Sequence, residues 1–378
     1  MDYAAIPLNV RIVRLANFVT PVSGGLRTSL DELGAGYLAA GHEPVLIVPG
    51  AAARDEQTRA GRRITVPGPM VPGMGGYRVI TARRRLRRLL DDLEPDRLEV
   101  SDRTTLRWTG SWARAAGVRS AMVSHESLAG LLRLSHLPAR RLADRLNHAS
   151  AEDYDTVICT TAWAAAEFER LGAPNLVRVP LGVDLDAFTP GHFDARMRAE
   201  LARPDQPLLV HCGRLSPEKR PDRSIRALAE LRRRGSSAVL AVAGDGPLLG
   251  ALRTRAAGLP VRFLGHVADR ERLARLLATA DVALAPGPVE TFGLAALEAL
   301  ASGTPVVVSR DSALPEVVGP AGAAVDDHPA AYADAIQTLL HPRFSAAARE
   351  RAERYTWPAA VKGFLRAHAL TDLPARRR

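Results

Sequence analysis

The sequence predicts an α/β protein made of two doubly wound parallel sheets, each covered by helices. Its 378 residues exceed what one hydrophobic core usually organises, since a domain typically holds ~100 to 200 residues. Short apolar runs alternate with longer amphipathic stretches, which is typical of strands joined by crossover helices. A stretch rich in proline, glycine and aspartate, PLGVDLDAFTPGHF, separates two such series. We therefore expect two domains with a boundary near Asp186.

The first series forms the expected N-terminal domain, residues 1–186. Its candidate strands are VRIVRLA, PVLIVPG, RLEVSD, RSAMVSH and DTVICTT, and a helix is expected over residues 27–40. The second series forms the expected C-terminal domain, residues 187–354, with candidate strands PLLVHCGR, AVLAVAG, VRFLGH, DVALAPG and TPVVVSR. Residues 355–378 have a helical period and are expected to pack back on the first domain, with a loose tail, LPARRR.

Composition describes an ordinary soluble globular chain, with 47% hydrophobic and 24% charged residues. No run approaches the ~20 apolar residues that cross a bilayer, and the N-terminus lacks the shape of a signal peptide. These features predict a cytoplasmic location. Cys159 and Cys212 each sit inside an apolar run, so we expect buried small side chains and assign them no chemistry.

The formal net charge of +10 favours an anionic partner, which could be nucleic acid, a phospholipid surface or a phosphorylated small molecule. Among the 51 lysines and arginines only Lys219 and Lys362 are lysines. A lysine retained against such a bias suits a compact ammonium that binds phosphate oxygens. Aromatic residues make up only 5%, and the arginines are scattered over many segments, so a nucleic-acid platform is not indicated.

Ligands of open α/β sheets bind beyond the carboxyl ends of the strands, so residues at those positions are candidates for a functional site. Gly24 and Gly25 follow the first strand and open a helix, where backbone amides could approach a phosphate or simply make a flexible turn. Arg214 and Lys219 follow the first strand of the second domain, around a turn that contains proline. Two converging cations would stabilise a diphosphate leaving group, whereas the alternative is a solvated cluster neutralised by Glu218 and Asp222.

The most specific motif is APGPVETFGLAALEALASGTPVVVS, in which Glu290 and Glu298 lie eight positions apart. Glu290 falls in a loop after a strand, and a helix would begin near Phe292 or Gly293, with unpaired backbone amides directed at a phosphate. Glu298 would lie on the second turn of that helix and reach another part of the same ligand. A sugar nucleotide offers hydroxyl groups at both ends, so the spacing favours such a ligand over a solvated pair of glutamates.

These residues resemble the retaining glycosyltransferases of the GT-B architecture, in which two Rossmann-like domains face a cleft, and within them the group with the Glu-x7-Glu signature. The resemblance covers essentially the whole chain through the SGG loop, SHES, GRLSPEKR, AGDGPL, FLGHV and ETFGLAALEALASGTPVV. More narrowly, the runs ANFVTPVSGGLRTSLDELGAGY, LEVSDRTTLR, MVSHESL and PLGVDLDAF are similar to actinobacterial GDP-mannose-dependent mannosyltransferases that act on phosphatidylinositol mannosides.

The resemblance implies a role for each matching residue. Arg214 and Lys219 would bind the diphosphate, Glu290 the donor sugar, and Glu298 the ribose. The other implied donor contacts come from the backbone of Phe292, Gly293 and Leu294, from Gly24 and Gly25 of the first domain, and from His125 beside the reacting centre. The implied co-substrate is GDP-mannose and the implied acceptor is a phosphatidylinositol mannoside or related glycolipid, with no metal and no other cofactor.

Two further kinds of motif match a known functional pattern, but we assign them no function. Asp153 with Asp155 and Asp184 with Asp186 each spell the Asp-x-Asp of metal-dependent transferases, but the first pair precedes a strand and the second lies in the linker. The glycines of the AGDGPL run partly match a dinucleotide fingerprint, but Pro247 interrupts it and no acidic residue ends the next strand.

The stretch TARRRLRRLLDDLEP predicts an amphipathic helix that could lie on an anionic membrane at the inner face of the plasma membrane. Its arginines would bind lipid head groups while Leu86, Leu89, Leu90 and Leu93 insert shallowly, unless those leucines are an ordinary core stripe. The arginines concerned are Arg83, Arg84, Arg85, Arg87 and Arg88.

The sequence leaves three rival functions open. The first is a UDP-sugar-dependent glycosyltransferase acting on a soluble metabolite, because nothing in the sequence distinguishes guanine from uracil. The second is an NAD-dependent oxidoreductase, which needs an intact fingerprint. The third is a pyridoxal phosphorylase, which needs a Schiff-base lysine, and neither lysine lies in a run typical of that site.

Overall fold

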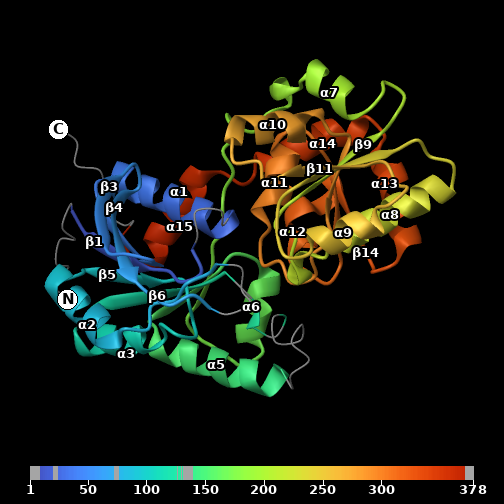
Figure 1. Cartoon of the computed structure of the whole chain (residues 1–378). Coiled ribbons are helices and arrows are strands. Elements are labelled where there is room, and N and C mark those ends of the chain that lie inside the picture. Colours follow the sequence, from blue (N-terminus) through green and yellow to red (C-terminus); the bar gives the residue numbers. More distant parts are fainter. Residues whose placement is uncertain are drawn as a thin grey trace. The chain divides into compact units, whose positions relative to one another are not determined.

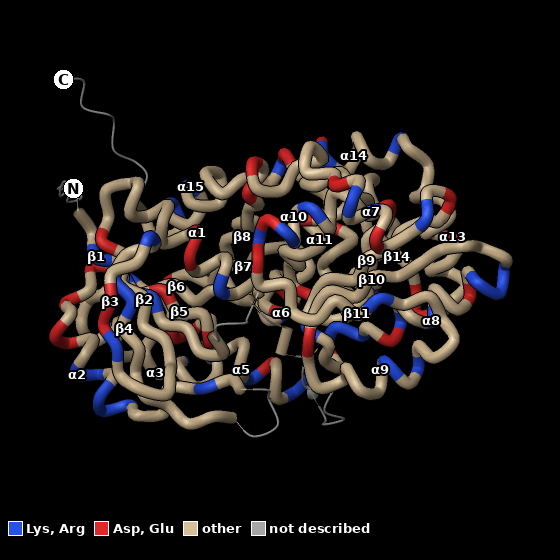
Figure 2. The backbone as a smooth tube through the Cα atoms, turned by 45° about the horizontal axis from the view of Figure 1, so that its top comes forward, with Lys and Arg blue, Asp and Glu red and all other residues tan. Residues whose placement is uncertain are grey.

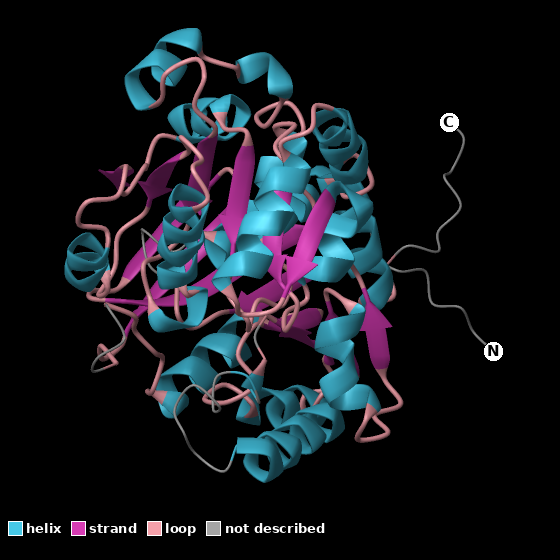
Figure 3. Cartoon of the chain, turned by 90° about the vertical axis from the view of Figure 1, so that its right-hand side faces the viewer, coloured by secondary structure: helices cyan, strands magenta, loops and turns pink. Residues whose placement is uncertain are grey.

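The computed structural model of the protein describes residues 9–19, 24–71, 76–125, 127, 128, 130 and 139–370. The chain forms two compact units (Figure 1). Unit 1 is Met1–His125, Pro138–Pro180 and Trp357–Arg378, and unit 2 is Glu126–Leu137 and Leu181–Thr356. From Pro138 onward, the chain passes from unit 1 to unit 2 after Pro180 and returns after Thr356. Each unit contains one sheet with helices packed on it, coloured by type in Figure 3.

The sheet of unit 1 has eight strands in the order β3-β4-β2-β1-β5-β6-β7-β8, parallel except for β3. Their bounds are β1 Arg11–Leu15, β2 Glu43–Gly50, β3 Arg54–Thr58, β4 Gly61–Pro67, β5 Arg97–Val100, β6 Arg119–Ser124, β7 Thr156–Cys159 and β8 Leu176–Arg178. All five strands expected in this half of the chain form. The β3–β4 hairpin and β8 were not expected, because β3 is polar along its whole length and β8 is only three residues long.

The helices of unit 1 cover both faces of this sheet. Their bounds are α1 Gly25–Ala39, α2 Arg83–Leu93, α3 Trp108–Ala115, α5 Ala139–Asp153, α6 Ala162–Glu169 and α15 Trp357–Ala367. Helices α1 and α15 lie on one face and α2, α3 and α5 on the other (Figure 1). The close approach of α1 and α15 requires Gly36, because a Cβ at that position would lie 2.2 Å from a methyl group of Val361. Helix α15 is shorter than the C-terminal stretch predicted to be helical, and the tail LPARRR lies outside the described residues.

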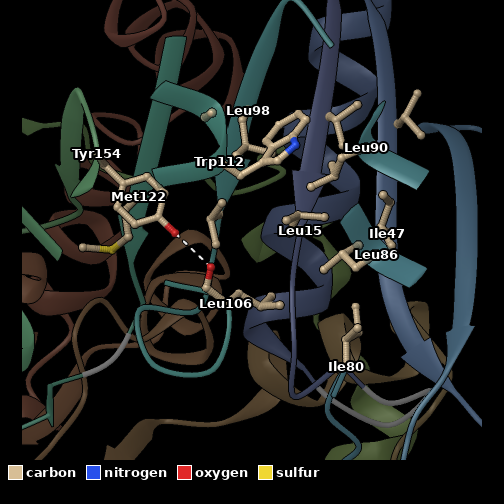
Figure 4. Close-up of a cluster of buried hydrophobic side chains, with 14 of the residues drawn as sticks. Leu15, Ile47, Ile80, Leu86, Leu90, Leu98, Leu106, Trp112, Met122 and Tyr154 are labelled. Carbon is tan, nitrogen blue, oxygen red and sulfur yellow. Dashed lines mark hydrogen bonds between the residues drawn. The ribbon is translucent and has the colours of Figure 1, made fainter. Parts of the chain in front are cut away.

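Alternation along the strands distributes apolar side chains to the two faces. Val45 and Ile47 join the larger core, whereas Leu46 and Val48 pack with Leu30 of α1 on the opposite face. Figure 4 shows the larger core around Leu15, Trp112 and Tyr154. The buried polar tips find partners there: the Tyr154 hydroxyl donates to the carbonyl of Leu106 at 3.3 Å, and the Trp112 indole donates to Asp91 at 2.8 Å.

A buried ionic cluster crosses the core of unit 1. Arg14 of β1 and Glu99 of β5 are each 1% exposed, and Arg14 Nε donates to Glu99 Oε1 at 2.8 Å. The other oxygen, Glu99 Oε2, accepts a hydrogen bond from the Tyr37 hydroxyl at 2.7 Å and lies 3.1 Å from His368 Nε2. Burial opposes ionisation of Glu99, but Arg14 and His368 outweigh it and hold the pKa of the carboxyl well below its usual range. The cluster therefore ties the C-terminal segment to the strands.

Unit 2 contains a six-stranded parallel sheet in the order β11-β10-β9-β12-β13-β14. The strands are β9 Leu208–Cys212, β10 Val239–Ala243, β11 Val261–Gly265, β12 Val282–Ala285, β13 Val306–Ser309 and β14 Gly322–Val325. The helices are α7 Ala195–Leu201, α8 Pro221–Arg233, α9 Leu249–Arg255, α10 Arg270–Thr279, α11 Leu294–Ala301, α12 Leu314–Val318, α13 Pro329–Leu339 and α14 Arg343–Ala352. Only β14 was not expected, because its sequence, GAAV, lacks the bulky apolar residues of the other strands.

The order of the strands sets where a ligand can bind in unit 2. From β9 the chain proceeds outward to β10 and β11, then returns to β12 on the other side of β9. The strand order therefore reverses between β9 and β12, and open α/β sheets bind ligands beyond the carboxyl ends of the strands at such a position. Within the described residues, no helix is both long and apolar enough to cross a membrane.

Candidate active site

The predicted residues of unit 2 follow the two strands at the centre of its sheet. Arg214 comes directly after β9, and Lys219 ends the 3₁₀ turn Pro217–Lys219 that precedes α8. Glu290 lies in the loop between β12 and α11. Because β9 and β12 are hydrogen-bonded neighbours, residues far apart in sequence meet at one edge of the sheet.

Lys219 and Glu290 form an ion pair between Nζ and Oε1. Their side chains are 35% and 19% exposed, so the pair is accessible from solvent. The two loops touch at Gly287, where a Cβ would lie 3.0 Å from the carbonyl oxygen of Glu218 and 3.3 Å from the Cα of Lys219. The sequence placed these residues in one site but did not predict that they pair with each other.

The acidic residues near Lys219 in sequence have other partners. Glu218 accepts a hydrogen bond from the Ser216 hydroxyl, and Asp222 accepts one from Arg220 Nε at 3.0 Å. Lys219 itself pairs with Glu290, which lies 71 positions away in the sequence. Arg214, partly buried, receives a hydrogen bond at its carbonyl oxygen from the backbone of Ser216 at 3.0 Å.

The loop after β10 packs against the loop after β9 through backbone contacts that only glycine permits. A Cβ at Gly244 would lie 1.9 Å from the carbonyl oxygen of Gly213, and one at Gly246 would lie 2.5 Å from that of Leu215. Leu215 N also donates to the Asp245 carbonyl at 2.9 Å. Close packing of two loops explains these glycines, and a dinucleotide fingerprint is not needed for them.

Helix α11 begins at Leu294, and within the described residues no side chain caps its N-terminus. Its N-cap is Gly293 at φ +78°, and a Cβ there would lie 2.2 Å from a methyl group of Leu314, so only glycine fits. Phe292 is buried and its ring packs edge-on against Tyr355, with centroids 5.9 Å apart. Phe292 and Leu294 therefore face the core with their side chains, and the groups left for a ligand are backbone amides at the positive end of the helix dipole.

Glu298 lies on the second turn of α11, partly buried beside the end of β9. The pKa of its carboxyl is raised to about 7, mainly by burial. The charge of Arg270 lowers this pKa, and the charge of Asp184 raises it. Burial likewise raises the pKa of the neighbouring Cys212 thiol to about 12, with a smaller contribution from Glu298. A thiol with that pKa is protonated at neutral pH and is a poor nucleophile.

The other predicted site residues belong to unit 1. His125 follows β6, and burial lowers the pKa of its imidazole to about 4, so the ring is neutral at pH 7. Gly24 is the N-cap of α1 and Gly25 is its first residue. No described atom lies within 4 Å of a Cβ built at Gly24, and its φ is −73°, so the described structure contains no steric reason for glycine there.

Helix α2 carries the predicted basic residues, which are coloured blue in Figure 2, and all five of these arginines are exposed. The predicted insertion of its leucines into lipid is wrong. Leu86, Leu90 and Leu93 are buried in the core of unit 1, and Leu89 packs against it. A helix that covers a sheet must bury its apolar stripe there, which leaves only the charged face for a partner.

The Asp-x-Asp motifs have structural roles. Asp153 accepts hydrogen bonds from Arg107 and Ser111, and Asp155 accepts one from the Ser120 backbone at 2.8 Å. Asp184 accepts from the backbone of Asp186 and Ala187 within its own turn. Among the residues that the structure describes, no group of three or more histidine, cysteine and acidic side chains could hold a metal ion.

Sequence reasoning missed the charged residues that are buried. Arg14 and Glu99 lie within predicted strands, and Arg223 lies in the first turn of α8, 5% exposed. The available signal was a charge inside an apolar strand or on the core-facing side of a helix, since such charges are rare unless they are paired.

Comparison with known proteins adds the evolutionary relationship. The model described as "Glycosyl transferases group 1" matches residues 193–356, and that described as "Glycosyl transferase 4-like domain" matches residues 24–182. A GDP-mannose-dependent alpha-(1-6)-phosphatidylinositol dimannoside mannosyltransferase of Mycobacterium tuberculosis is 52% identical over 366 residues, 94% of this chain and 95% of that protein. The corresponding monomannoside enzyme of Mycolicibacterium smegmatis is 33% identical over 369 residues, 88% of this chain and 90% of that protein.

Solved structures share the fold. Sucrose-phosphate synthase of Thermosynechococcus elongatus matches with a TM-score of 0.78 at 22% identity, covering 95% of this chain and 98% of that chain. WaaG, a glycosyltransferase involved in lipopolysaccharide biosynthesis, matches with a TM-score of 0.70 at 17% identity, covering 96% and 100%. The predicted fold class of two Rossmann-like domains is confirmed, and the chain belongs to the group 1 glycosyltransferases, the family 4 type with the GT-B fold.

Proposed function

We propose that the protein transfers mannose from GDP-mannose to a phosphatidylinositol mannoside or a closely related glycolipid, with retention of the anomeric configuration. The observation that carries this proposal is the 52% identity, over 94% of the chain, to a mannosyltransferase named for that donor and a dimannoside acceptor. The Lys219–Glu290 pair beyond the ends of β9 and β12 supports it, because it offers a cation and a carboxylate to a negatively charged sugar donor.

Unit 2 is the proposed donor-binding domain. Lys219 and Arg214 bind the diphosphate, and the backbone amides of Gly293 and Leu294, with that of Phe292, add donors at the start of α11. Glu290 accepts hydrogen bonds from the hydroxyl groups of the sugar, and Glu298 accepts them from the ribose. The cations stabilise the charge that develops as the leaving group departs.

The proposed reaction exchanges one bond at the anomeric carbon of mannose for another. The bond from this carbon to the β-phosphate oxygen breaks, and a bond to an acceptor hydroxyl oxygen forms on the same face. The proton of the acceptor hydroxyl goes to an oxygen of the departing phosphate, so the products are the mannosylated lipid and GDP. No carboxylate pair with the loop placement of a glycosidase stood out from the sequence, and this route needs none.

Unit 1 is the proposed acceptor domain. The imidazole of His125 is neutral at pH 7 because burial lowers its pKa, so it can donate one hydrogen bond to a sugar hydroxyl and accept another. Gly24 and Gly25 open α1, where backbone amides suit a phosphate-containing ligand. The five exposed arginines of α2 bind an anionic membrane surface through electrostatics alone, because the leucines beneath them are occupied by the core.

The test is a transfer assay with purified protein, GDP-mannose labelled in the sugar, and vesicles that contain phosphatidylinositol dimannoside. We expect label in a trimannosylated lipid with an α-linkage. Parallel reactions with UDP-glucose, and with inositol phosphate as a soluble acceptor, examine the rival glycosyltransferase. Transfer only from UDP-glucose, or only to the soluble acceptor, would contradict the proposal.

A further inference from the structure

Arg223 is a buried guanidinium that none of the proposed donor contacts uses. It lies in the first turn of α8 and is 5% exposed. Its Nη1 donates to the carbonyl oxygen of Pro286 at 2.9 Å and to the Ser309 hydroxyl at 3.3 Å, and its Nη2 lies 2.8 Å from a carboxylate oxygen of Asp327. Arg223 therefore links the ends of β12 and β13 to the segment after β14.

The contacts to Pro286 and Ser309 distinguish Arg223 from its neighbours. Asp327 also pairs with Arg220 and Arg226, each at 3.4 Å, so its charge remains compensated without Arg223. Arg226 is on the same helix, one turn later, and is 35% exposed. Removing charge from water is costly, so a buried guanidinium persists only where several acceptors surround it.

Both segments of the Lys219–Glu290 pair meet at Arg223. Helix α8 begins at Pro221, just after Lys219, so the backbone of Arg223 is attached to the lysine segment. Its side chain donates a hydrogen bond to Pro286, which begins the loop that contains Glu290. The same two segments touch at Gly287, where a Cβ would lie 3.0 Å from the Glu218 carbonyl oxygen.

We propose that Arg223 is a positioning residue that sets the separation of Lys219 and Glu290. By tying α8 to the loop after β12, it keeps the ammonium and the carboxylate within reach of one ligand before the ligand arrives. The consequence for catalysis rests on the proposed function, in which Lys219 binds the diphosphate and Glu290 the sugar. The positioning itself depends only on the contacts in unit 2.

The composition of the chain allows a direct test of the positioning. Because Lys219 and Lys362 are the only lysines, protein labelled with ¹³C at lysine Cε gives two side-chain NMR signals, which Lys362→Arg assigns. In Arg223→Met we expect the Lys219 signal to move toward its position in Glu290→Gln, where the pair is broken. In Arg226→Met, the matched control, we expect it to stay at the wild-type position. An unchanged Lys219 signal in folded Arg223→Met would overturn the proposal.

Turnover separates this inference from the proposed function. With saturating GDP-mannose, Arg223→Met is expected to lose about a hundredfold in kcat, as expected for misplaced catalytic groups, whereas Arg226→Met loses less than about threefold. Equal losses in the two variants would overturn a specific role for Arg223. A moved Lys219 signal with wild-type turnover would support the positioning and contradict the catalytic role proposed for the pair.

Gly287→Ala provides a second route if Arg223→Met does not fold. Its φ is not in the left-handed region, so the added methyl group acts by separating the two segments at their contact point. The Lys219 signal should move in the same direction as in Glu290→Gln. A Lys219 signal that stays in place when the two segments are forced apart would contradict the inference.

Discussion

Units 1 and 2 each contain a contact between an acid and a base from different segments, and these contacts have different surroundings. In unit 1, Glu99 and Arg14 are 1% exposed, and further contacts to Tyr37 and His368 complete the cluster. In unit 2, Lys219 and Glu290 remain 35% and 19% exposed. Loss of one member of a buried charge pair leaves an uncompensated charge in the core, whereas a pair that is accessible to solvent can exchange its partner for a substrate.

The largest expected effect is the loss of stability that follows when the buried Arg14–Glu99 contact is broken. Glu99→Gln leaves the Arg14 guanidinium buried without its counter-ion, which typically costs ~3–5 kcal/mol in the free energy of unfolding. The matched control is Glu43→Gln, because Glu43 pairs with Arg11 across β1 and β2 of the same sheet at about one-third exposure and should cost ~0–1 kcal/mol. Urea unfolding at pH 7 measures the stability of both variants. Equal losses of free energy of unfolding would show that burial does not make the Glu99 contact more important than the Glu43 contact.

The buried cluster also predicts how stability depends on pH. Glu99 has a lowered pKa in the folded protein, so its contribution is present above the unfolded value near 4.5 and is lost as pH falls below it. Wild type should therefore lose more free energy of unfolding than Glu99→Gln on acidification from pH 5 to pH 3. Parallel pH profiles would show that the carboxylate is not stabilised by the cluster.

The second-largest effect is the loss of turnover that is expected when the solvent-accessible Lys219–Glu290 pair is broken. Lys219→Met should lower kcat by about a hundredfold or more, since one donor to developing charge contributes ~3 kcal/mol to transition-state stabilisation. The free energy of unfolding should change less than in Glu99→Gln, because Lys219 and Glu290 are both more exposed than Arg14 and Glu99. Steady-state kinetics and urea unfolding on one preparation check both statements. A stable variant with wild-type kcat would remove Lys219 from the reaction.

Glu298 differs from both pairs because its pKa of about 7 makes its charge change near neutral pH. If its carboxylate accepts hydrogen bonds from the ribose, donor affinity should rise with pH up to about 7.5 and level off above it. Below pH 7 affinity should fall by up to about tenfold per pH unit. Calorimetry with GDP between pH 5.5 and pH 8.5 measures this. Glu298→Gln is the control, and an identical pH profile in that variant would exclude Glu298 as the titrating group.

A smaller effect concerns the exposed arginines of α2. Each arginine changed to glutamine should weaken binding to vesicles that contain anionic lipid by ~1 kcal/mol at low salt, since these charges act additively near a surface. The effect should shrink as salt rises, because the Debye length falls below ~10 Å above 0.1 M. Co-sedimentation with anionic and neutral vesicles measures it. Equal sedimentation after all five changes would leave α2 as an ordinary covering helix.

Removal of divalent metal ions is expected to leave activity unchanged. Activity should persist in excess chelator, because two cations and the start of α11 can neutralise the diphosphate. Transfer assays with and without EDTA check this. Loss of activity that magnesium or manganese restores would require a metal site and a new search for its ligands.

Much of the fold was predictable because the apolar runs of its central strands are local signals. Strands such as β9 and β12, and the start of α11 near Gly293, appear within one or two residues of their predicted positions. The polar β3 and the small-residue β14 were missed because hydrophobicity does not mark them. The family was predictable for the same reason, since its motifs are contiguous runs such as GRLSPEKR and ETFGLAALEALASGTPVV.

The sequence by itself determined the α/β class, the central strands of both domains and which residues follow them. Only the tertiary structure decided which charges meet. Lys219 pairs with Glu290, 71 positions away, because β9 and β12 are neighbours in the sheet. The leucines of α2 pack in the core, and Arg223 reaches Pro286, for a similar reason: each partner comes from a distant segment. A local pattern records the period of a strand or helix, but the neighbours of a side chain depend on strand order and helix packing, which arise only when the whole unit folds.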